Sequence, residues 1–388
     1  MGLFAHWVLC WTSPAVILAW ACLLELHPGL AFQLGKVQAI ASRAWEVSTL
    51  NTYGAGLGHW AEWCDVNKVP EEKWLPIDKT HLACFIADAA GSISASSFDN
   101  WLNGLRAWHG YHDVPWCGDN EFVQLTLKGA RKLAPCLSTR DPRPPVLIAH
   151  LNAIYDIMDF QNSYDAACWA VVCTAFWGLA RLGEITVTSL KPIDPTQNVQ
   201  RKALLTWNED FGVKSITVRL PWTKTSQWGT NLILTYEEEL SCPFRALQQH
   251  LSTNRDLPDE APLFAFRTLE GWELMVKQVL MHQLHGIWTT KGLLLPSGHS
   301  FHIGGTTHLL GRGTNPQMVQ KLGHWSSDAF YLYWRNTQLI IPEHVHKAAV
   351  ERIEAGMVGY FDEVSGEARK RWQEIQWAQK RRKEHRAE

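Results

Sequence analysis

Apolar side chains recur at helical spacing along residues 36–135. The clearest case starts at position 48, where aromatic and apolar residues repeat every three or four positions: Tyr53, Leu57, Trp60 and Cys64. Further amphipathic segments follow at residues 79–90, 97–109 and 122–133. Prolines, which interrupt helices, separate these segments: Pro70, Pro76 and Pro115. The pattern predicts a four-helix domain with short loops.

Residues 136–146 break this pattern. The stretch CLSTRDPRPPV is polar and rich in proline, a composition that favours an extended, semi-rigid connection. We therefore place a domain boundary there. Helical character resumes in residues 147–160 and 163–177. The second of these segments is almost entirely apolar, as expected for a helix that is buried on all sides.

The pattern changes to that of strands in residues 203–235. Residues 215–220 (SITVRL) alternate and are β-branched, and residues 231–235 (NLILT) follow, with Gly229 as a turn residue between them. This arrangement predicts a β-hairpin in a small antiparallel sheet. Further along, residues 262–266 look extended, whereas residues 242–251 and 272–287 return to helical spacing.

These patterns predict a mainly α protein with a small antiparallel β-sheet. We divide the chain into a hydrophobic N-terminal extension (1–35), a helical domain (36–135), a linker (136–146), a mixed α/β domain (147–345) and a charged helical tail (346–388).

Composition narrows the classes of function. A length of 388 residues suggests two or three domains. The net charge of −2 gives no pointer to an acidic partner, so any contact with nucleic acid needs local patches of Lys and Arg. The 9 cysteines are an odd number without a C-x-x-C pair, which fits reduced thiols and lacks zinc-ligand spacing. Cysteine spacing therefore gives no indication of a metal, and we expect no cofactor.

One stretch, residues 298–335, concentrates the candidate chemistry. It reads GHSFHIGGTTHLLGRGTNPQMVQKLGHWSSDAFYLYWR, with His299 and His302 near its start, His324 after a Leu-Gly turn, and Tyr333 nine residues later. This stretch resembles the C-terminal active-site segment of the tyrosine recombinases, the phage-integrase-like enzymes that break and rejoin DNA. That family carries H-x-x-R, then L-G-H or L-G-R, then a tyrosine. The likeness is strongest to versions from fungal mobile elements.

Two earlier segments match the same family in the expected order. GLARLGEIT resembles the family's G-L-R-x-x-E segment and places Arg181 one helical turn before Glu184. LPWTKT places Lys224 in the predicted hairpin, where the family has its catalytic lysine, although Lys202 and Lys214 remain competitors. The resemblance covers roughly residues 40–340 and implies a helical core-binding domain that clamps DNA, followed by a mixed α/β catalytic domain.

The resemblance also implies a reaction. A tyrosine hydroxyl attacks a DNA phosphodiester and forms a 3′-phosphotyrosine link that stores the bond energy, so neither ATP nor a metal is required. Tyr333 is the predicted nucleophile, and Tyr331 is the alternative. The other implied roles are a phosphate clamp that Glu184 holds in place (Arg181), a general acid (Lys224), a proton acceptor or donor (His299) and a phosphate hydrogen bond (His324).

His302 departs from the family pattern, which has a second arginine at this place. An arginine would supply a permanent charge and a fixed fork of donors, whereas a histidine is shorter and mostly neutral at pH 7. Losing one such donor commonly costs ~10²–10³ in rate. We therefore expect DNA binding to persist and strand cleavage to be strongly reduced. The alternative is a catalytically dead DNA-binding relic of a mobile-element recombinase.

The expected partner is double-stranded DNA, with four protomers on two duplexes if the enzyme is active. Residues 1–24 contain no charged side chain and, at roughly 20 apolar positions, are long enough to span a bilayer. A membrane anchor (residues 3–24), a signal peptide and a non-native extension are all open interpretations. We favour the last, because an anchor gives little advantage to a DNA enzyme. We expect a nuclear or intracellular protein, in which the basic run at residues 380–383 is a nuclear address, a phosphate contact or a solvated helix end.

Overall fold

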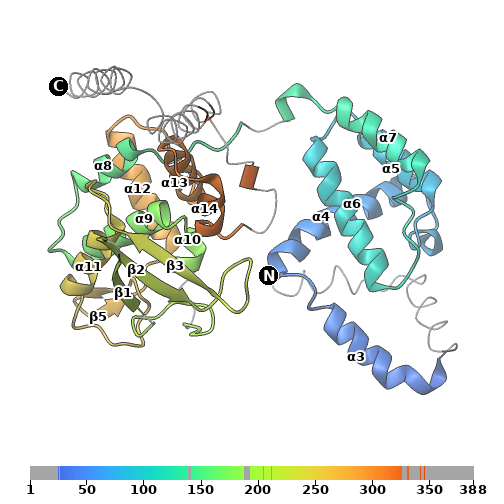
Figure 1. Ribbon diagram of the computed structural model, residues 1–388. Coiled ribbons are helices and arrows are strands. Elements are labelled where there is room, and N and C mark those ends of the chain that lie inside the picture. Colours follow the sequence, from blue (N-terminus) through green and yellow to red (C-terminus); the bar gives the residue numbers. More distant parts are fainter. Residues whose placement is uncertain are drawn as a thin grey trace, which may run out of the picture. The chain divides into compact units, whose positions relative to one another are not determined.

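The computed structural model describes residues 25, 27–138, 141–187, 193–203, 205–210, 212–325, 330, 331, 341 and 345. The chain divides into two compact units, Met1–Asp141 and Pro142–Glu388. The division falls inside the stretch that the sequence predicts as a linker. Figure 1 shows the first unit in blue to green and the second in green to orange.

Helices build the first unit. Among the described residues they are η1 (Pro28–Leu30), α3 (Ala31–Ala41), α4 (Val47–Val66), η2 (Glu71–Lys73), α5 (Lys79–Ala89), α6 (Ala95–Tyr111), α7 (Glu121–Lys132) and η3 (Cys136–Ser138). Helices α4 to α7 coincide with the four helices that apolar spacing predicts. Asp78, Ser94 and Asn120 cap α5, α6 and α7, since their side-chain oxygens accept hydrogen bonds from first-turn amides.

Tryptophan dominates the core of this unit. Trp60 and Trp108 are fully buried, and Phe85 and Phe98 pack in the same cluster. Most tryptophans that the structure describes here therefore contribute hydrophobic burial rather than a surface for stacking on bases.

Two glycines bring α4 and α6 together backbone against backbone. A Cβ on Gly56 would lie 2.5 Å from the carbonyl oxygen of Trp101, and a Cβ on Gly104 would lie 2.4 Å from that of Tyr53. Because no real side chain tolerates such distances, each helix needs glycine where it meets the other.

Helix α9 (Ser163–Trp177) is the centre of the second unit. Every residue from Ala166 to Trp177 is buried, as the unbroken apolar run predicts. Around it pack α8 (Ile148–Tyr155), α10 (Leu182–Ile185), α11 (Pro243–Thr253) and α13 (Ser300–Gly311).

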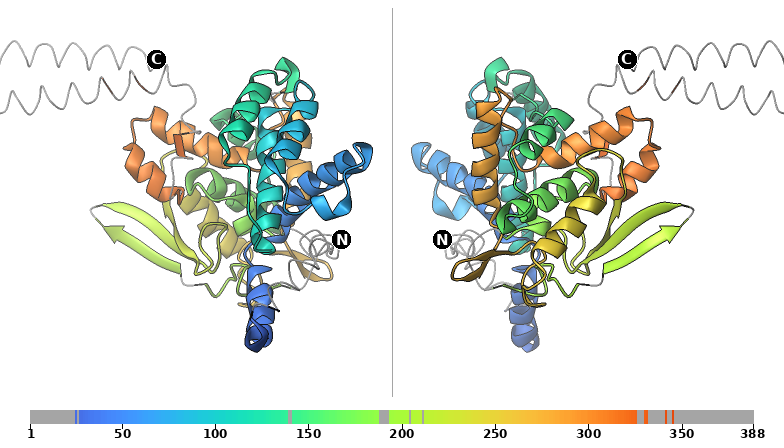
Figure 2. Two further views of the ribbon diagram at one scale, coloured as in Figure 1. Left: turned by 90° about the vertical axis from the view of Figure 1, so that its right-hand side faces the viewer. Right: turned by 90° about the vertical axis from the view of Figure 1, so that its left-hand side faces the viewer.

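A three-stranded antiparallel sheet covers one side of these helices. Its order is β1 (Leu205–Asp210), β2 (Val213–Leu220) and β3 (Thr230–Thr235), with Ser215 opposite Thr235 and Leu220 opposite Thr230. The inward positions alternate along the strands and are all buried: Ile216, Val218, Leu220, Leu232 and Leu234. Figure 2 shows the yellow-green strands projecting to one side of the helices.

The remaining elements correct one prediction. Apolar spacing predicts a helix over residues 272–287, but Gly271–Glu273 forms strand β5, which pairs with β4 (Phe266–Thr268), and helix α12 (Lys277–Thr290) begins later. Gly271, with φ 135, makes the tight turn that a helix cannot contain. Helix α14 (Pro316–Leu322) follows α13.

Several predictions fall on residues that the structure does not describe. These are the hydrophobic segment 3–24, the basic run 380–383 and Tyr333. Across the described ranges, no helix combines the length and apolar character needed to cross a membrane.

Candidate active site

Arg181 lies immediately before α10 and is held by Glu184. Its Nη1 donates a hydrogen bond of 3.0 Å to Oε1 of Glu184, and its backbone N–H donates one of 3.2 Å to Oε2. The side chain of Glu184 is only 4% exposed, whereas that of Arg181 is 21% exposed. The buried carboxylate therefore fixes the direction in which the guanidinium reaches toward solvent.

The same carboxylate holds the loop that carries Lys224. The backbone N–H of Lys224 donates to Oε1 of Glu184 at 3.3 Å. Paired hydrogen bonds between Thr223 and Ser226 close the loop, so that Thr223 is buried and Lys224 is exposed. Two predicted catalytic residues from distant parts of the sequence are thus tied to one glutamate.

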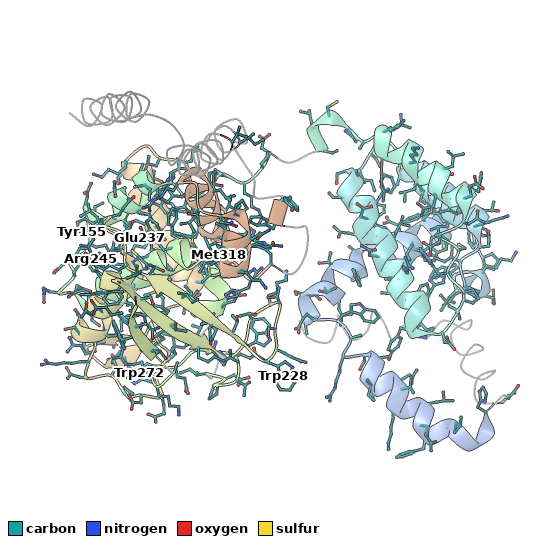
Figure 3. The ribbon with its side chains drawn as sticks, viewed as in Figure 1. Tyr155, Trp228, Glu237, Arg245, Trp272 and Met318 are labelled. Atoms are coloured by element: carbon teal, nitrogen blue, oxygen red, sulfur yellow. The ribbon has the colours of Figure 1, made fainter. Side chains whose placement is uncertain are left out.

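The loop ends in a tight turn with an exposed aromatic residue. Gly229 has φ 72, and a Cβ there would lie 2.0 Å from the carbonyl oxygen of Leu220. Trp228, which precedes it, is 80% exposed, and its carbonyl oxygen accepts a hydrogen bond of 2.7 Å from Arg219. Figure 3 places Trp228 at the outer end of the β2–β3 hairpin.

His299 directly precedes α13, without a side-chain hydrogen bond that caps the helix, and several cations act on its charge. Burial, followed by the positive charges of Arg143, Arg181, Lys224 and Lys277, lowers its pKa to about 4. The imidazole is therefore neutral near pH 7. Its ring lies 5.6 Å from that of His302, one helical turn later, and is nearly parallel to it.

His302 is fully buried and binds backbone. Its Nδ1 lies 2.6 Å from the carbonyl oxygen of Leu179. Because a carbonyl only accepts, Nδ1 carries the hydrogen. Burial, together with the charge of Arg181, lowers the pKa of His302 to about 3, so the ring is neutral and Nε2 carries a lone pair. His302 therefore lacks the positive charge that an arginine, expected here from the sequence pattern, would carry.

His324 lies beside the hairpin. Its backbone has φ 57, and its Nε2 donates a hydrogen bond of 3.1 Å to the carbonyl oxygen of Asn231 in β3. With its N–H on Nε2, the neutral ring has no hydrogen on Nδ1 to donate, so the phosphate hydrogen bond that the sequence predicts for this residue would need a hydrogen on Nδ1 as well. The next residue, Trp325, packs edge-on against His302 with ring centroids 4.4 Å apart.

Of the two candidate nucleophiles, the structure describes Tyr331 alone. Tyr331 is 60% exposed, whereas the neighbouring Phe330 is buried in a cluster with Leu179, Leu310 and Val319. The segment therefore packs against the same turn that leads to Arg181. Tyr333 lies outside the described residues, and the structure does not place it relative to the site.

The structure thus brings Arg181, Lys224, His299 and His302 together and sets His324 next to the hairpin. Sequence reasoning missed Arg143, Lys277 and Trp325. The first two belong to none of the matched motifs, so no sequence signal identifies them. Trp325 directly follows His324 within LGHWSSD, so its position beside a predicted site residue was a signal.

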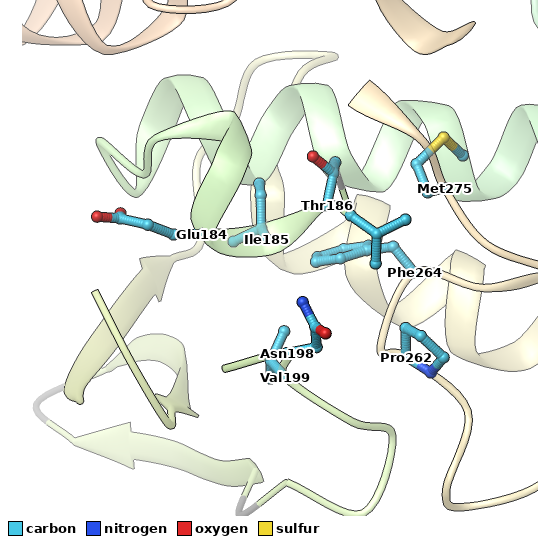
Figure 4. A pocket seen from close by; sticks show the side chains of 9 residues that line it. Glu184, Ile185, Thr186, Asn198, Val199, Pro262, Phe264 and Met275 are labelled. Carbon is cyan, nitrogen blue, oxygen red and sulfur yellow. The ribbon is translucent and has the colours of Figure 1, made fainter. Parts of the chain in front are cut away.

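A small cavity lies next to Glu184. The cavity behind α10 has a volume of about 10 Å³, no more than one water molecule needs. Figure 4 shows the carboxylate of Glu184 to one side of this cavity, away from Phe264 and Met275. Among the described residues, no group of three or more His, Cys, Asp or Glu side chains is arranged to hold a metal ion.

No protein-family model matches the chain, and no curated protein matches it. Solved structures do match. The XerH site-specific recombinase, in a post-cleavage complex with a palindromic difH substrate, matches 89% of this chain and 94% of its own, with 15% identity and a TM-score of 0.52. The Tn1549 transposon integrase with transposon right end DNA matches 88% of this chain and 100% of its own, at 12% identity and a TM-score of 0.46. A lambda integrase dimer bound to a COC′ core site matches 77% of this chain and 93% of its own, at 14% identity and a TM-score of 0.44.

The likeness to XerH shows that the chain has the fold of the tyrosine recombinases. It confirms the predicted fold class, which is mainly α with a small antiparallel sheet.

Proposed function

We propose that this protein binds double-stranded DNA and recombines it through a 3′-phosphotyrosine intermediate. The observation that carries the proposal is the shared anchor of Arg181 and Lys224 on Glu184, with the neutral His299 facing both cations. A guanidinium, an ammonium and a neutral imidazole in one place are the groups that phosphodiester transfer without a metal requires. The fold of the tyrosine recombinases supports the same conclusion.

In the proposed reaction, Oη of Tyr333 attacks the phosphorus and the bond from phosphorus to the 5′ oxygen breaks. His299, whose lowered pKa keeps its imidazole neutral at neutral pH, accepts the phenol proton as the general base. Lys224 donates a proton to the departing 5′ oxygen. Arg181 binds a non-bridging oxygen, where negative charge grows in the transition state. The reverse sequence, with a 5′ hydroxyl as the nucleophile, rejoins the strand.

We propose that His302 slows this reaction. The ring is neutral, and its Nδ1–H is engaged by Leu179, so it supplies neither the charge nor the fork of an arginine. The expected cost is ~10²–10³ in cleavage rate. DNA binding persists, because Arg181 and Lys224 remain.

The neutral, backbone-bound His302 also favours a second candidate function, that of a DNA-binding relic that no longer cleaves. Both candidates share the helical unit as a clamp and the exposed Trp228 as a contact on DNA. They differ in whether a covalent intermediate forms and in whether four protomers join two duplexes. A mobile-element origin and a nuclear or intracellular location complete the proposal.

The general-acid role of Lys224 can be tested with a substrate that needs no acid. A 5′-bridging phosphorothioate leaves as a thiolate, so it departs without protonation. Lys224→Ala is expected to cleave the oxygen substrate ~10²–10⁴ times more slowly than the unchanged protein and the sulfur substrate at a similar rate. Lys214→Ala is the matched control, because Lys214 is the exposed competitor on β2. Equal losses on both substrates would contradict the role.

A further inference from the structure

Lys277 lies at the start of α12, outside every motif that the sequence identifies. Its backbone N–H donates a hydrogen bond of 3.0 Å to the carbonyl oxygen of Val187. The backbone N–H of Val187 in turn donates one of 3.1 Å to the carbonyl oxygen of Met275. Val187 and Val276 thereby form a parallel β-bridge. This bridge fixes the first residue of α12 beside the segment that follows Arg181 and Glu184.

The side chain of Lys277 extends toward the predicted site. A Cβ on Gly298 would lie 3.0 Å from its Cε, 3.7 Å from its Nζ and 3.0 Å from Cδ1 of Leu182. Gly298 precedes His299, and Leu182 follows Arg181. The end of the Lys277 side chain therefore lies close to Gly298, the residue before His299, at a point that the side chain of Leu182 also approaches.

The charges around this point favour an anion. Arg143, Arg181, Lys224 and Lys277 all act on His299, and the carboxylate of Glu184 already binds two of the segments that carry them. Lys277 forms no ion pair with a carboxylate among the described residues. Like charges held together repel each other, and an oxyanion placed among them relieves that repulsion.

We propose that Lys277 binds the phosphate that is attacked, next to Arg181, and supplies positive charge where His302 supplies none. The proposal rests on the proposed function and adds a residue to it. A lysine gives a point charge without the bidentate fork of an arginine, so the replacement is partial. The half-buried position of Lys277 strengthens its interaction with a phosphate relative to that of a fully solvated lysine.

The salt dependence of DNA binding tests this proposal without requiring cleavage. The full chain and its variants are titrated against a fluorescein-labelled duplex of 30 base pairs at several KCl concentrations. Lys277→Met is expected to reduce the slope of log Kd against log[KCl] by about 1 and to weaken binding roughly tenfold at 0.1 M KCl. Lys277→Arg is expected to behave as the unchanged protein.

The matched control is Lys291→Met. Lys291 follows the other end of α12 and pairs with Asp156 at 3.6 Å, so its loss is expected to leave the slope unchanged. Circular dichroism checks that each variant folds, and Lys277→Gln replaces Lys277→Met if the latter does not.

A double variant tests whether Lys277 and Arg181 share one phosphate. Arg181→Ala with Lys277→Met is expected to weaken binding by less than the two single changes combined, because contacts to one group are not additive. Strict additivity, or a slope unchanged in Lys277→Met, would overturn the role of Lys277 while leaving DNA binding intact. A chain that binds no duplex at all would overturn the proposed function itself.

Discussion

The Nδ1–H of His302 donates a hydrogen bond of 2.6 Å to the carbonyl oxygen of Leu179, a residue with a left-handed backbone of φ 50. Leu179 lies two positions before Arg181. A non-glycine residue in this conformation needs surrounding contacts to hold it. His302, which the sequence pattern matches to the second arginine of the tyrosine recombinases, therefore stabilises the turn that precedes Arg181.

Removing the imidazole is expected to destabilise the second unit. In His302→Ala the carbonyl of Leu179 loses its buried donor and a cavity opens beside Trp325, at a cost of about 3 kcal/mol. Urea unfolding measures the loss. His285→Ala is the control, because His285 also binds a carbonyl, that of Pro296, but is only half-buried. Similar losses in both variants would show that His302 has no special structural role.

Replacing His302 by arginine is expected to separate stability from activity. His302→Arg returns a permanent charge and donors to the site, so cleavage is expected to rise by roughly tenfold or more. The larger side chain enters a fully buried position, so the melting temperature is expected to fall. Cleavage kinetics and thermal melting are measured on the same preparation. No gain in rate would mean that another element of the site limits the reaction.

Glu184 is expected to affect cleavage without weakening DNA binding. Glu184→Gln weakens the hold on Arg181 and the Lys224 loop, and a misplacement of about 1 Å costs ~10² in rate. Duplex binding is expected to stay equal or tighten, because a negative charge is removed. Glu237→Gln, which breaks a surface ion pair with Arg312, is the control and is expected to change neither property. Parallel losses of binding and cleavage would point to unfolding instead.

Stability is expected to fall as the pH drops from about 6.5 toward 4. Burial lowers the pKa of three fully buried histidines: His109 (to about 4), His250 (to about 4) and His302 (to about 3). Each is neutral when folded and protonated when unfolded in this window, so unfolding takes up protons. Each contributes a loss of about 1.4 kcal/mol per pH unit. In His250→Gln, unfolding is expected to take up one proton fewer in this window, so the slope of unfolding free energy against pH becomes smaller. An unchanged slope would contradict the assignment.

The sequence predicted the elements whose information is local. Helices α4 to α7, the buried α9 and the β2–β3 hairpin follow from apolar periodicity and turn residues. It failed where a tertiary contact decides the outcome. Strand β5 takes residues that were predicted as helix because Gly271 lets the chain turn back on β4.

The candidate site likewise contains residues that a local motif identifies and residues that only a tertiary contact brings to the site. Arg181, Lys224 and His299 lie in motifs, so they could be identified from the sequence. Lys277 reaches the site only through the bridge between Val187 and Val276, which joins segments far apart in the chain. The bond from His302 to Leu179 likewise depends on how α13 packs against the turn after α9.

The most direct test of the account is a trapping assay for the covalent intermediate. The full chain is incubated with nicked suicide duplexes from the DNA that flanks its coding sequence, and the products are separated on a denaturing gel. The account predicts a slowly forming protein–DNA band that disappears in Tyr333→Phe and persists in Tyr331→Phe. A chain that shifts the duplex on a native gel but never forms the band, even as His302→Arg, would contradict the proposed recombinase and leave the DNA-binding relic.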